Sequence, residues 1–310
     1  GNSNTEQKIM EGVLYSNRIC KTFRRFYSMK PIGIIGNGFV GGAVANGLKN
    51  FCEVRIYDTD EERRTHTYTD VVFSDFVFVC LPTPMVDMEG GKCNLSILEN
   101  FFEELPTICE GTFIIKSTVP IGTTEKLCIK YPHLKIVHNP EFLTAANAKE
   151  DFVNADRHVI GGNEEWVSDV EDFYKMCYPD IPVFTMKSSE SECVKYFANC
   201  FLAAKVMVFN EMRVLVDNIE DVDYDSVMQG VISDRRIGNS HYNVPGPDGD
   251  YGFGGTCFPK DINALIHTMI ENNMNPLVMK SIWEQNKNYR KNWDWAESTS
   301  AVLSESENTQ

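Results

Sequence analysis

Short runs of β-branched and aromatic residues alternate with helical patterns through the first half of the chain. The apolar runs predict strands, and the spacing of apolar residues between them predicts helices at 40–48 and 95–105. The predicted strands are 32–35, 53–57, 76–80, 112–116 and 135–137. Strands that alternate with helices are typical of βαβ units, so the sequence predicts an α/β fold with a parallel sheet.

A single long helical pattern follows this half. It runs from Ser188 to about Ile219 without Gly or Pro, which corresponds to roughly 45 Å at 1.5 Å per residue. Such a helix is too long to cover a small α/β layer. We therefore expect it to link two domains or to form a subunit interface. A further helix is expected at 262–270.

Both ends of the chain differ in composition from the part between them. The first 30 residues carry six Lys or Arg against two Glu, and we expect 1–28 to be a disordered leader. A transit peptide is the alternative, although the two glutamates argue against it. Residues 293–310 are expected to be a disordered tail, since 296–310 is rich in Ser, Thr and Glu. The 310 residues then leave room for two domains.

The charge and the cysteines narrow the classes of function. Lys and Arg number 29 against 44 Asp and Glu, a net charge of −15 that repels phosphate backbones and anionic lipid. This argues against a nucleic-acid or membrane-surface protein, and no apolar run approaches the ~18 residues of a membrane helix. No pair of the ten cysteines has Cys-x-x-Cys spacing, and the six histidines show no ligand spacing. The sequence therefore predicts reduced thiols in a cytoplasmic protein without a metal site.

A glycine-rich turn follows the first predicted strand and opens a helix. Its sequence is Gly36-Asn37-Gly38-Phe39-Val40-Gly41, and Asp58 stands at the end of the next strand, 22 residues after Gly36. This context is the dinucleotide-binding fingerprint, in which the glycines let a pyrophosphate approach the helix N-terminus. Asp58 would accept hydrogen bonds from the adenosine ribose and repel a 2′-phosphate, so the sequence predicts NAD rather than NADP. The alternative is a tight turn that binds nothing.

A second glycine-rich segment contains a cysteine and also opens a helix. Its sequence is Gly252-Phe253-Gly254-Gly255-Thr256-Cys257-Phe258-Pro259-Lys260-Asp261. Three glycines give a bare backbone able to lie against a substrate, and Pro259 suits the first turn of the following helix. Cys257 would lie at that helix N-terminus, where the dipole favours the thiolate. We interpret Cys257 as a nucleophile, and the alternative is an inert buried thiol.

The long helical pattern carries a lysine and an asparagine four residues apart. Lys195 and Asn199 share one helix face among apolar neighbours. They could form a solvated polar stripe, or, beside a thiolate and a bound dinucleotide, they could polarise a carbonyl and stabilise an oxyanion. Two other lysines rank below Lys195. Lys260 is expected to face solvent or form an ion pair, and Lys205 lies near the opposite helix face.

These motifs and others between them resemble the UDP-glucose/GDP-mannose 6-dehydrogenase family over roughly residues 29–290. The motifs that carry the resemblance are the glycine turn, Leu81-Pro82-Thr83-Pro84, Lys116-Ser117-Thr118-Val119-Pro120, Asn139-Pro140-Glu141-Phe142-Leu143, Lys195 to Asn199, Asp234-Arg235-Arg236-Ile237-Gly238 and the cysteine segment. The resemblance implies an N-terminal Rossmann-type NAD-binding domain at 29–187. It implies a helical central domain for dimerisation and catalysis at 188–292.

The resemblance also implies an activity. It is an NAD-dependent, four-electron oxidation of the C6 hydroxyl of a nucleotide sugar to a carboxylate. UDP-glucose is the expected substrate, with UDP-N-acetylmannosamine or GDP-mannose as alternatives. Cys257 would add to the aldehyde as a thiohemiacetal and pass through a thioester that water hydrolyses. Two other readings remain open: a two-electron hydroxyacid or sugar-acid dehydrogenase, and a non-catalytic, truncated NAD-binding paralogue.

The resemblance gives individual residues their roles. Lys195 and Asn199 would hold the C6 oxygen, Asp261 would activate water or take up a proton, and Thr118 and Glu141 would position that water. The residues implied in NAD binding are Gly36, Asn37, Gly38, Phe39, Val40, Gly41, Asp58, Pro82, Thr83, Ser117 and Thr118. Those implied in substrate binding are Glu141, Phe142, Leu143, Lys195, Asn199, Arg236, Tyr251, Gly252, Phe253, Gly254 and Gly255. Arg236 would reach the substrate of a partner subunit, which implies a homodimer through the long helix.

The chain departs from the family pattern in three places. Ala145 stands where many members have a second glutamate. The loop between Arg236 and Cys257 is longer than usual and contains Pro245 to Asp250. The pattern ends near Asn286, before the C-terminal domain in which the family binds the nucleotide. The choice of base therefore stays open.

Overall fold

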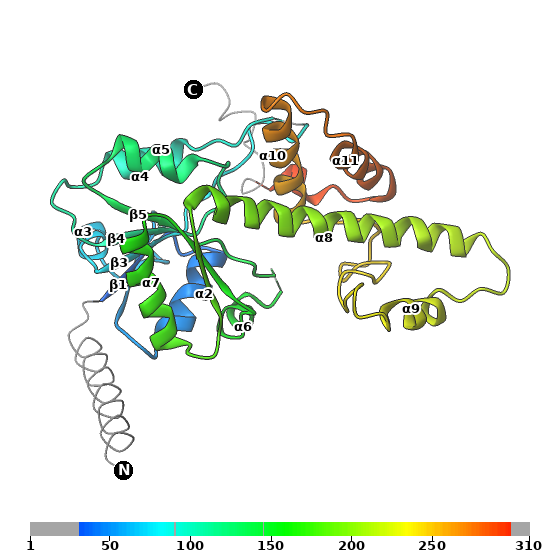
Figure 1. Cartoon of the computed structure of the whole chain (residues 1–310), viewed down its shortest axis with the longest axis horizontal. Coiled ribbons are helices and arrows are strands. Elements are labelled where there is room, and N and C mark those ends of the chain that lie inside the picture. Colours follow the sequence, from blue (N-terminus) through cyan, green and yellow to red (C-terminus); the bar gives the residue numbers. More distant parts are fainter. Residues whose placement is uncertain (1–30, 90, 145, 299–310) are drawn as a thin grey trace, which may run out of the picture. The chain divides into compact units, whose positions relative to one another are not determined.

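The computed structural model describes residues 31–89, 91–144 and 146–298, whose contacts form two compact units (Figure 1). The first unit takes the described residues up to Cys80 together with Leu105–Lys116 and Lys130–Lys187. The second takes Leu81–Glu104, Ser117–Ile129 and the chain from Ser188 onward. The segments 81–104 and 117–129 therefore group with the helical second half, and the domain limits expected from the sequence stay a prediction.

One seven-stranded sheet forms the centre of the first unit. Its strands are β1 (Ile32–Ile35), β2 (Val54–Tyr57), β3 (Phe76–Val79), β4 (Thr112–Ile115), β5 (Lys135–His138), β6 (His158–Gly161) and β7 (Val183–Met186). The order is β2-β1-β3-β4-β5-β6-β7, and all neighbours are parallel except the antiparallel pair β5–β6. The α/β fold predicted from the sequence is confirmed, with this one pair as the exception to a parallel sheet.

Helices cover both faces of the sheet in the first unit. They are α2 (Phe39–Leu48), α3 (Tyr68–Val72), α6 (Ala148–Val153) and α7 (Glu164–Cys177). One face packs against α2, α6 and α7 in a core that includes Ile34, Phe152 and Phe173. On the other face, α3 packs closely against β1. A Cβ atom on Gly33 would lie only 2.4 Å from the carbonyl oxygen of Val71 in α3. A glycine is therefore required at this position.

The strand order identifies where this sheet would bind a ligand. β2 and β3 lie on opposite sides of β1, so the chain reverses its direction of travel across the sheet there. Ligands of open α/β sheets bind at such a switch point, outside the carboxyl ends of the strands. The turn Gly36–Gly41 follows the carboxyl end of β1 and therefore lies at that point.

Helices make up the second unit. They are α4 (Ser96–Glu103), α5 (Thr123–Lys130), α8 (Ser188–Asp217), α9 (Tyr224–Ile232), α10 (Cys257–Glu271), α11 (Leu277–Tyr289) and the 3₁₀ helix η1 (Asp294–Glu297). The long helix expected at 188–219 is confirmed as α8. Side chains of α8, α10 and α11 share one core, which includes Tyr196, Ile262 and Trp283, and Met85 joins it from the segment 81–104.

The described end of the chain is ordered where the sequence predicted a tail. The tail was expected from residue 293, whereas η1 forms there and Trp295 is only 2% exposed. The indole of Trp295 packs 5.1 Å from that of Trp283 and covers the core of the second unit. The expected leader at 1–28 and the rest of the tail lie outside the described residues.

Two further observations concern the sequence-based expectations. All nine cysteines within the described residues are thiols rather than disulfides. Among the helices of residues 31–298 that the structure describes, none is both long and apolar enough to span a membrane.

Candidate active site

The glycine turn after β1 has the backbone geometry that its sequence predicts. Gly36 has φ +88°, a left-handed conformation that favours glycine, and its N–H donates to the carbonyl of Tyr57 at 2.9 Å. A Cβ atom on Gly41 would lie 1.9 Å from the carbonyl oxygen of Gly36. Both glycines are therefore required for α2 to start directly against β1.

The N-terminus of α2 can receive an anion. Gly38 is its N-cap and provides no side-chain hydrogen bond, and the first turn contains no acidic residue. A Cβ atom on Gly38 would have no neighbour within 4 Å, so the space over the turn is open. Amide groups at a helix start and the helix dipole attract phosphate. The turn therefore fits the pyrophosphate of a dinucleotide.

Asp58 is hydrogen-bonded to the turn. Its Oδ2 accepts from the N–H of Asn37 at 2.7 Å, and its Oδ1 accepts from the N–H of Asp60 at 2.9 Å. The Asn37 amide also donates to the carbonyl of Arg63 at 2.7 Å. A carboxylate has about four lone-pair sites, so Asp58 keeps capacity for two ribose hydroxyls. Asp58 thus fixes the turn, and its contact with a ribose stays a prediction.

Cys257 is the first residue of α10, in the second unit. Thr256 is the N-cap, and its Oγ1 lies 3.9 Å from the Cys257 Sγ. Pro259 falls in the first turn, as the sequence predicted, and that turn holds no acidic residue. The cysteine is half-buried. A thiol at a helix N-terminus is in the setting that favours its thiolate.

The polar residues of α8 and α10 meet in the core of the second unit. Asn199 Nδ2 donates to Asp261 Oδ2 at 2.6 Å, and the two residues are 7% and 1% exposed. Lys195, one turn before Asn199 on α8, is 2% exposed, so these residues do not form a solvated stripe. Asp261 follows Cys257 by four residues, which puts both on one face of α10.

Lys260 lies against Asp261 rather than in solvent. Its Nζ is 3.7 Å from Asp261 Oδ1, and the lysine is only 9% exposed. Within the described residues, that Oδ1 has no hydrogen-bond partner. Lys260 was expected either to face solvent or to form an ion pair, and it forms the ion pair, with Asp261.

Two loops assigned to the cofactor are tied together. Thr83 Oγ1 donates to the carbonyl of Thr118 at 2.6 Å, and Ser117 Oγ donates to the carbonyl of Leu81 at 2.6 Å. Thr83, Ser117 and Thr118 are buried, and Pro82 is exposed. The structure thus brings together residues that are 35 positions apart in the sequence.

Glu192 is a buried residue of this region that the sequence analysis missed. Its carboxylate accepts from Gly122 N at 2.5 Å, from Thr124 N at 2.9 Å and from Thr124 Oγ1 at 2.7 Å. It is 0% exposed, and burial raises its pKa against the lowering effect of these hydrogen bonds. Glu192 caps the start of α5 and ties the segment that contains Thr118 to α8, three residues before Lys195. A glutamate near the start of a long helix gave no sequence signal for this contact.

Glu141 belongs to the first unit, in the loop after β5. It is 8% exposed, and its Oε2 accepts from the N–H of Leu143 at 2.6 Å. The guanidinium carbon of Arg157 lies 4.3 Å from the centroid of the Phe142 ring, a cation–π contact that holds the ring. Ala145, at the departure from the family pattern, lies outside the described residues.

The glycines before Cys257 make room for protein side chains. A Cβ atom on Gly252 would lie 2.3 Å from Asn286 Oδ1, and one on Gly254 would lie 1.9 Å from Arg290 Nη2. Only Gly255 borders open space, at φ +73°. The bare backbone expected to face substrate at all three glycines is therefore packed against protein at two of them.

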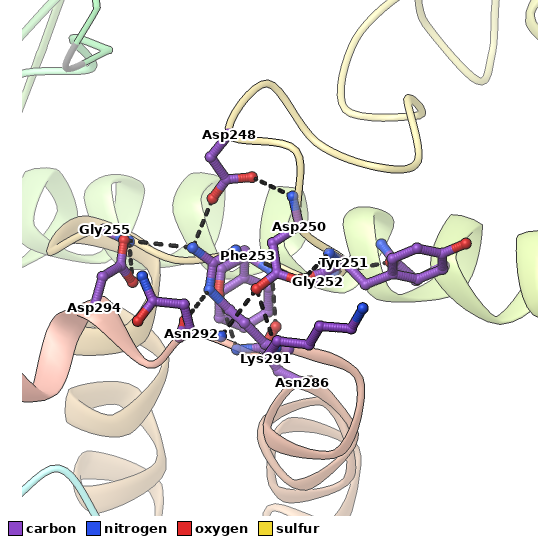
Figure 2. A network of polar contacts seen from close by, with 12 residues as sticks. Asp248, Asp250, Tyr251, Gly252, Phe253, Gly255, Asn286, Lys291, Asn292 and Asp294 are labelled. Carbon is purple, nitrogen blue, oxygen red and sulfur yellow. Dashed lines mark hydrogen bonds and ion pairs between the residues drawn. The ribbon is translucent and has the colours of Figure 1, made fainter.

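The N–H groups of this loop are also engaged. Gly252 N donates to Asn210 Oδ1 at 2.8 Å, and Phe253 N donates to Asn286 Oδ1 at 2.7 Å. Gly255 N lies 3.0 Å from both oxygens of Asp294. Figure 2 shows the loop meeting Asn286 and the segment at Lys291 to Asp294. The sequence analysis assigned no contact to any of these three side-chain acceptors, because lone Asn and Asp residues carry no pairing signal.

Arg236 and Lys205 lie at the loop that follows α9. The Arg236 side chain is 90% exposed and pairs with Asp234 at 2.6 Å. Lys205 Nζ donates to the carbonyls of Ile237 at 2.8 Å and Gly238 at 3.3 Å. Lys205 therefore anchors this loop to α8.

Comparisons with known proteins agree with these observations. The NAD-binding domain model of the UDP-glucose/GDP-mannose dehydrogenase family matches residues 47–178, and its central domain model matches 189–288. The first unit is thus a Rossmann-type NAD-binding domain, and its cofactor is NAD. In the part of the chain that the structure describes, no group of three His, Cys, Asp or Glu residues could hold a metal ion.

Individual relatives are similar over most of the chain. UDP-glucose 6-dehydrogenase of Pseudomonas aeruginosa is 32% identical over 229 residues, 69% of this chain and 48% of that protein. A UDP-glucose dehydrogenase structure from Pyrobaculum islandicum is 30% identical, with a TM-score of 0.73 over 84% of this chain and 68% of that one. A UDP-D-ManNAc dehydrogenase structure from Pyrococcus horikoshii, at 20% identity and a TM-score of 0.70 over 84% and 68%, shares the fold.

The share of each relative that is covered differs between these matches. The chain spans about half the length of the Pseudomonas relative and of a Rickettsia prowazekii UDP-glucose 6-dehydrogenase, 48% and 53%. Both domain models and the Pyrobaculum structure identify the same family. The chain belongs to the UDP-glucose/GDP-mannose dehydrogenase family.

Proposed function

We propose that this chain oxidises the C6 hydroxyl of a nucleotide sugar to a carboxylate with NAD, and that UDP-glucose is converted to UDP-glucuronate. The observation that carries the proposal is Cys257 as first residue of α10, one turn before an Asp261 that is hydrogen-bonded to Asn199. A two-electron dehydrogenase needs no such thiol. The family and its UDP-glucose dehydrogenase relatives favour UDP-glucose as substrate.

The first oxidation uses residues of α8 and α10. Lys195 and the Asn199 amide hold the C6 oxygen and stabilise the charge that develops on it. Asp261 receives the hydroxyl proton, directly or through water. The Gly36–Gly41 turn and Asp58 would hold NAD, which supplies the acceptor for the hydride that leaves C6. The product of this stage is an aldehyde.

The second oxidation is covalent. The Cys257 thiolate attacks the aldehyde carbon, a C–S bond forms, and the oxygen takes a proton to give a thiohemiacetal. Loss of a second hydride from the same carbon gives a thioester. Water, activated by Asp261 and positioned by Thr118 and Glu141, cleaves the C–S bond and releases the carboxylate and the thiol. Two hydrides, and so four electrons, leave each sugar.

A homodimer through α8 is part of the proposal. One face of α8 is apolar and exposed along its length, at the positions Phe197 (57%), Phe201 (68%), Val208 (49%), Met212 (42%) and Leu215 (61%). These residues recur at helical spacing, and contiguous exposed apolar surface marks an interaction site. A two-fold axis would pair this face with its own copy. Arg236, 90% exposed at its side chain, would then be presented to the partner's substrate.

The test is the yield of NADH on limiting UDP-glucose, read at 340 nm beside a uronate assay. Two NADH per sugar together with UDP-glucuronate would support the proposal, and one NADH with aldehyde would contradict the covalent step. UDP-N-acetylmannosamine and GDP-mannose are assayed in parallel, since oxidation of either in place of UDP-glucose would reassign the substrate. NADH from none of the three would favour a non-catalytic NAD-binding protein.

The matched variant is Cys257→Ala. It should abolish uronate formation while NAD binding, measured by titration, stays within about twofold of wild type, because the thiol belongs to the second unit and the cofactor turn to the first. Unchanged uronate output from this variant would remove the thioester from the mechanism.

A further inference from the structure

We propose that Arg290 and Asp294 are positioning residues for Cys257, acting by fixing the glycine loop 252–255 that leads into α10. Both lie beyond the residues that the central-domain model matches, which end at 288. The inference rests on the proposed function, because a fixed loop has a catalytic consequence only if Cys257 attacks the substrate. The contacts that carry it all lie within the second unit.

Arg290 is a buried guanidinium surrounded by acceptors. Its side chain is 2% exposed, and its Nη2 donates to Asp248 Oδ2 at 2.6 Å and lies 3.4 Å from Asp294 Oδ2. Its Nε donates to the carbonyl of Asn292 at 2.8 Å, and its Nη1 reaches the carbonyl of Tyr251 at 3.5 Å. A buried charge is stable only when it is paired and hydrogen-bonded in this way. Removing it would leave several acceptors without a donor.

The glycine loop packs directly against this guanidinium. A Cβ atom on Gly254 would overlap Arg290 Nη2, at 1.9 Å, so the loop approaches the guanidinium to a distance only glycine allows. Beside the guanidinium, Gly255 N donates to the carboxylate of Asp294, whose two oxygens are both 3.0 Å away. Arg290 and Asp294 thus hold consecutive residues of the loop, and Cys257 follows Gly255 by two positions.

Contacts of Asn286 and Asp250 add to those of Arg290 and Asp294, and we call these four residues together the clamp (Figure 2). Asn286, 0% exposed, accepts from Phe253 N at 2.7 Å and donates to the Phe253 carbonyl at 2.9 Å. Asp250 Oδ2 accepts from the backbone N–H groups of Lys291 and Asn292, each at 3.0 Å. Residues 250–255 are therefore joined in both directions to α11 and the segment after it: backbone amides of the loop donate to side chains, and the Asp250 carboxylate accepts from backbone amides.

The glycine content of the loop is the reason that it needs to be fixed for the chemistry. Glycine loses more backbone entropy on ordering than any other residue, so a segment with three glycines in four residues would sample many conformations without its clamp. Gly252 and Gly255 are both held at positive φ, +68° and +73°. The reacting sulfur must stay within a few tenths of an ångström of its attack geometry for efficient addition. The clamp supplies that constraint at the start of α10.

The experiment compares Arg290→Met, Asp294→Ala and the conservative Asp294→Asn with the wild-type chain. Asn at 294 retains one oxygen to accept from Gly255 N, so it should restore what Ala loses. Lys287→Met is the matched control, since Lys287 lies on α11 and pairs with Glu89 and Glu284 instead of with the loop. Thermal unfolding monitors whether each variant is folded.

The direct readout is amide hydrogen exchange of the peptide that covers residues 252–256. We expect exchange to be about tenfold faster in Arg290→Met and Asp294→Ala, because loop N–H groups lose their fixed acceptors. The kcat on UDP-glucose should fall about tenfold while the dissociation constant of NAD changes less than about twofold. Unchanged exchange would overturn the clamp. Faster exchange with unchanged kcat would overturn its positioning role.

A separate measurement distinguishes this inference from the proposed function. The rate of Cys257 alkylation by iodoacetamide, followed by peptide mass spectrometry across pH, needs no turnover. In Arg290→Met and Asp294→Ala, the midpoint of this profile should rise relative to wild type, since a loosened loop weakens the hold of the helix N-terminus on the thiolate. A wild-type chain that oxidises no nucleotide sugar would refute the proposed function. The alkylation midpoint would then be the test of the positioning role: a raised midpoint in the variants would support it, and an unchanged midpoint would overturn it.

Discussion

At the scale of single residues, the carboxylate of Asp58 combines a structural contact with a proposed ligand contact. It accepts the N–H of Asn37 from the glycine turn and the N–H of Asp60 from its own loop. An oxygen held in this way has a fixed position before a ribose arrives, and the negative charge opposes a 2′-phosphate. The same side chain would therefore set both the affinity for NAD and the preference over NADP.

Asp58→Ala should weaken NAD binding by about tenfold or more, because a hydrogen bond to a charged group contributes about 1.5–3 kcal/mol. The preference for NAD over NADP should decrease at the same time, since the repulsion of the 2′-phosphate is lost. Titration of both cofactors by calorimetry measures this. Asp60→Ala removes a neighbouring carboxylate and is the control. An unaltered ratio of the two affinities in Asp58→Ala would place the ribose elsewhere.

His158 is a buried histidine that no sequence motif singles out. Its ring stacks on Tyr174 at 3.9 Å, and its Nε2 has no hydrogen-bond partner among the described residues. Burial, with Lys116 as a second cause, lowers the pKa of His158 from 6.5 to about 3. Because the unfolded chain binds this proton more readily, the stability that neutral His158 allows is complete above pH 6.5. It is lost as the pH falls from 6.5 towards 3.

We expect His158→Phe to reduce the acid sensitivity of the first unit. Between pH 7.5 and 5, protonation of His158 in the unfolded state should lower the wild-type free energy of unfolding by about 2 kcal/mol, a loss that phenylalanine avoids. Urea unfolding at the two pH values, followed for both proteins, measures the difference. His133→Phe, at an exposed position, should retain the wild-type loss. Equal losses in His158→Phe and wild type would contradict a buried neutral imidazole.

At the scale of elements, α5 is capped by a residue of another helix. Glu192 of α8 accepts three donors at the start of α5, where its own sequence offers no equivalent carboxylate contact. This joins a short helix to a long one through one buried side chain. It also ties Gly122, directly before α5, to α8.

Glu192→Ala should lower the free energy of unfolding by about 2–4 kcal/mol, since it leaves buried donors unsatisfied and creates a small cavity. Glu192→Gln keeps an acceptor oxygen in place and should cost about 1 kcal/mol. Denaturant unfolding at neutral pH compares the two. Glu190→Ala, from the first turn of the same helix, controls for an acidic residue at the start of α8. The capping role would be refuted by equal effects of Ala and Gln at position 192.

The elements show what the sequence can and cannot predict. β1, α2 and α8 follow from patterns within the elements themselves, such as apolar runs, a glycine turn and helical periodicity, and each was located within one or two residues. β6 and β7 are as short as the strands that were predicted, but their own patterns are weaker: β6 has only Val159 and Ile160 between a His and a Gly, and β7 is a partly exposed edge strand. Tertiary pairing defines them instead, β6 with β5 and β7 with β6.

In the candidate site, too, residues within a local sequence pattern were predicted and residues placed by distant contacts were not. Cys257 and its helix start were predicted because Gly, Cys and Pro stand in a local pattern with a physical meaning. Arg290 and Asp294 were not, because a contact 42 residues away in the sequence leaves no mark on either partner's neighbours. The expected disordered tail at 293 was wrong at its start for the same reason, since Trp295 is ordered by Trp283.

At the scale of the whole molecule, the apolar face of α8 is a surface that a single chain leaves exposed. Five large apolar side chains, from Phe197 to Leu215, line it. Removing apolar surface from water contributes about 25 cal/mol per Å², so burial of this face would be favourable. Copies of a chain with a net charge of −15 repel one another, and a local apolar contact of this kind would favour pairing against that repulsion.

Phe201→Glu combined with Leu215→Glu should therefore convert a dimer to a monomer, because it places charges on both halves of the apolar face. Light scattering after size exclusion measures the mass, and Ile129→Glu, 73% exposed on α5, should leave the dimer intact. A monomeric wild-type chain would refute the interface.

The proposed dimer also allows a test of which subunit supplies Arg236. Cys257→Ala and Arg236→Ala should each be inactive alone, but if Arg236 acts on the partner's substrate, their heterodimer has one site with both residues intact. Half of the dimers in an equilibrated mixture are heterodimers, each with one working site, so about a quarter of wild-type activity should return. If Arg236 acts within its own subunit, no combination restores a complete site and the mixture stays inactive. The recovered activity thus determines whether the exposed arginine beside Asp234 serves its own chain or its partner.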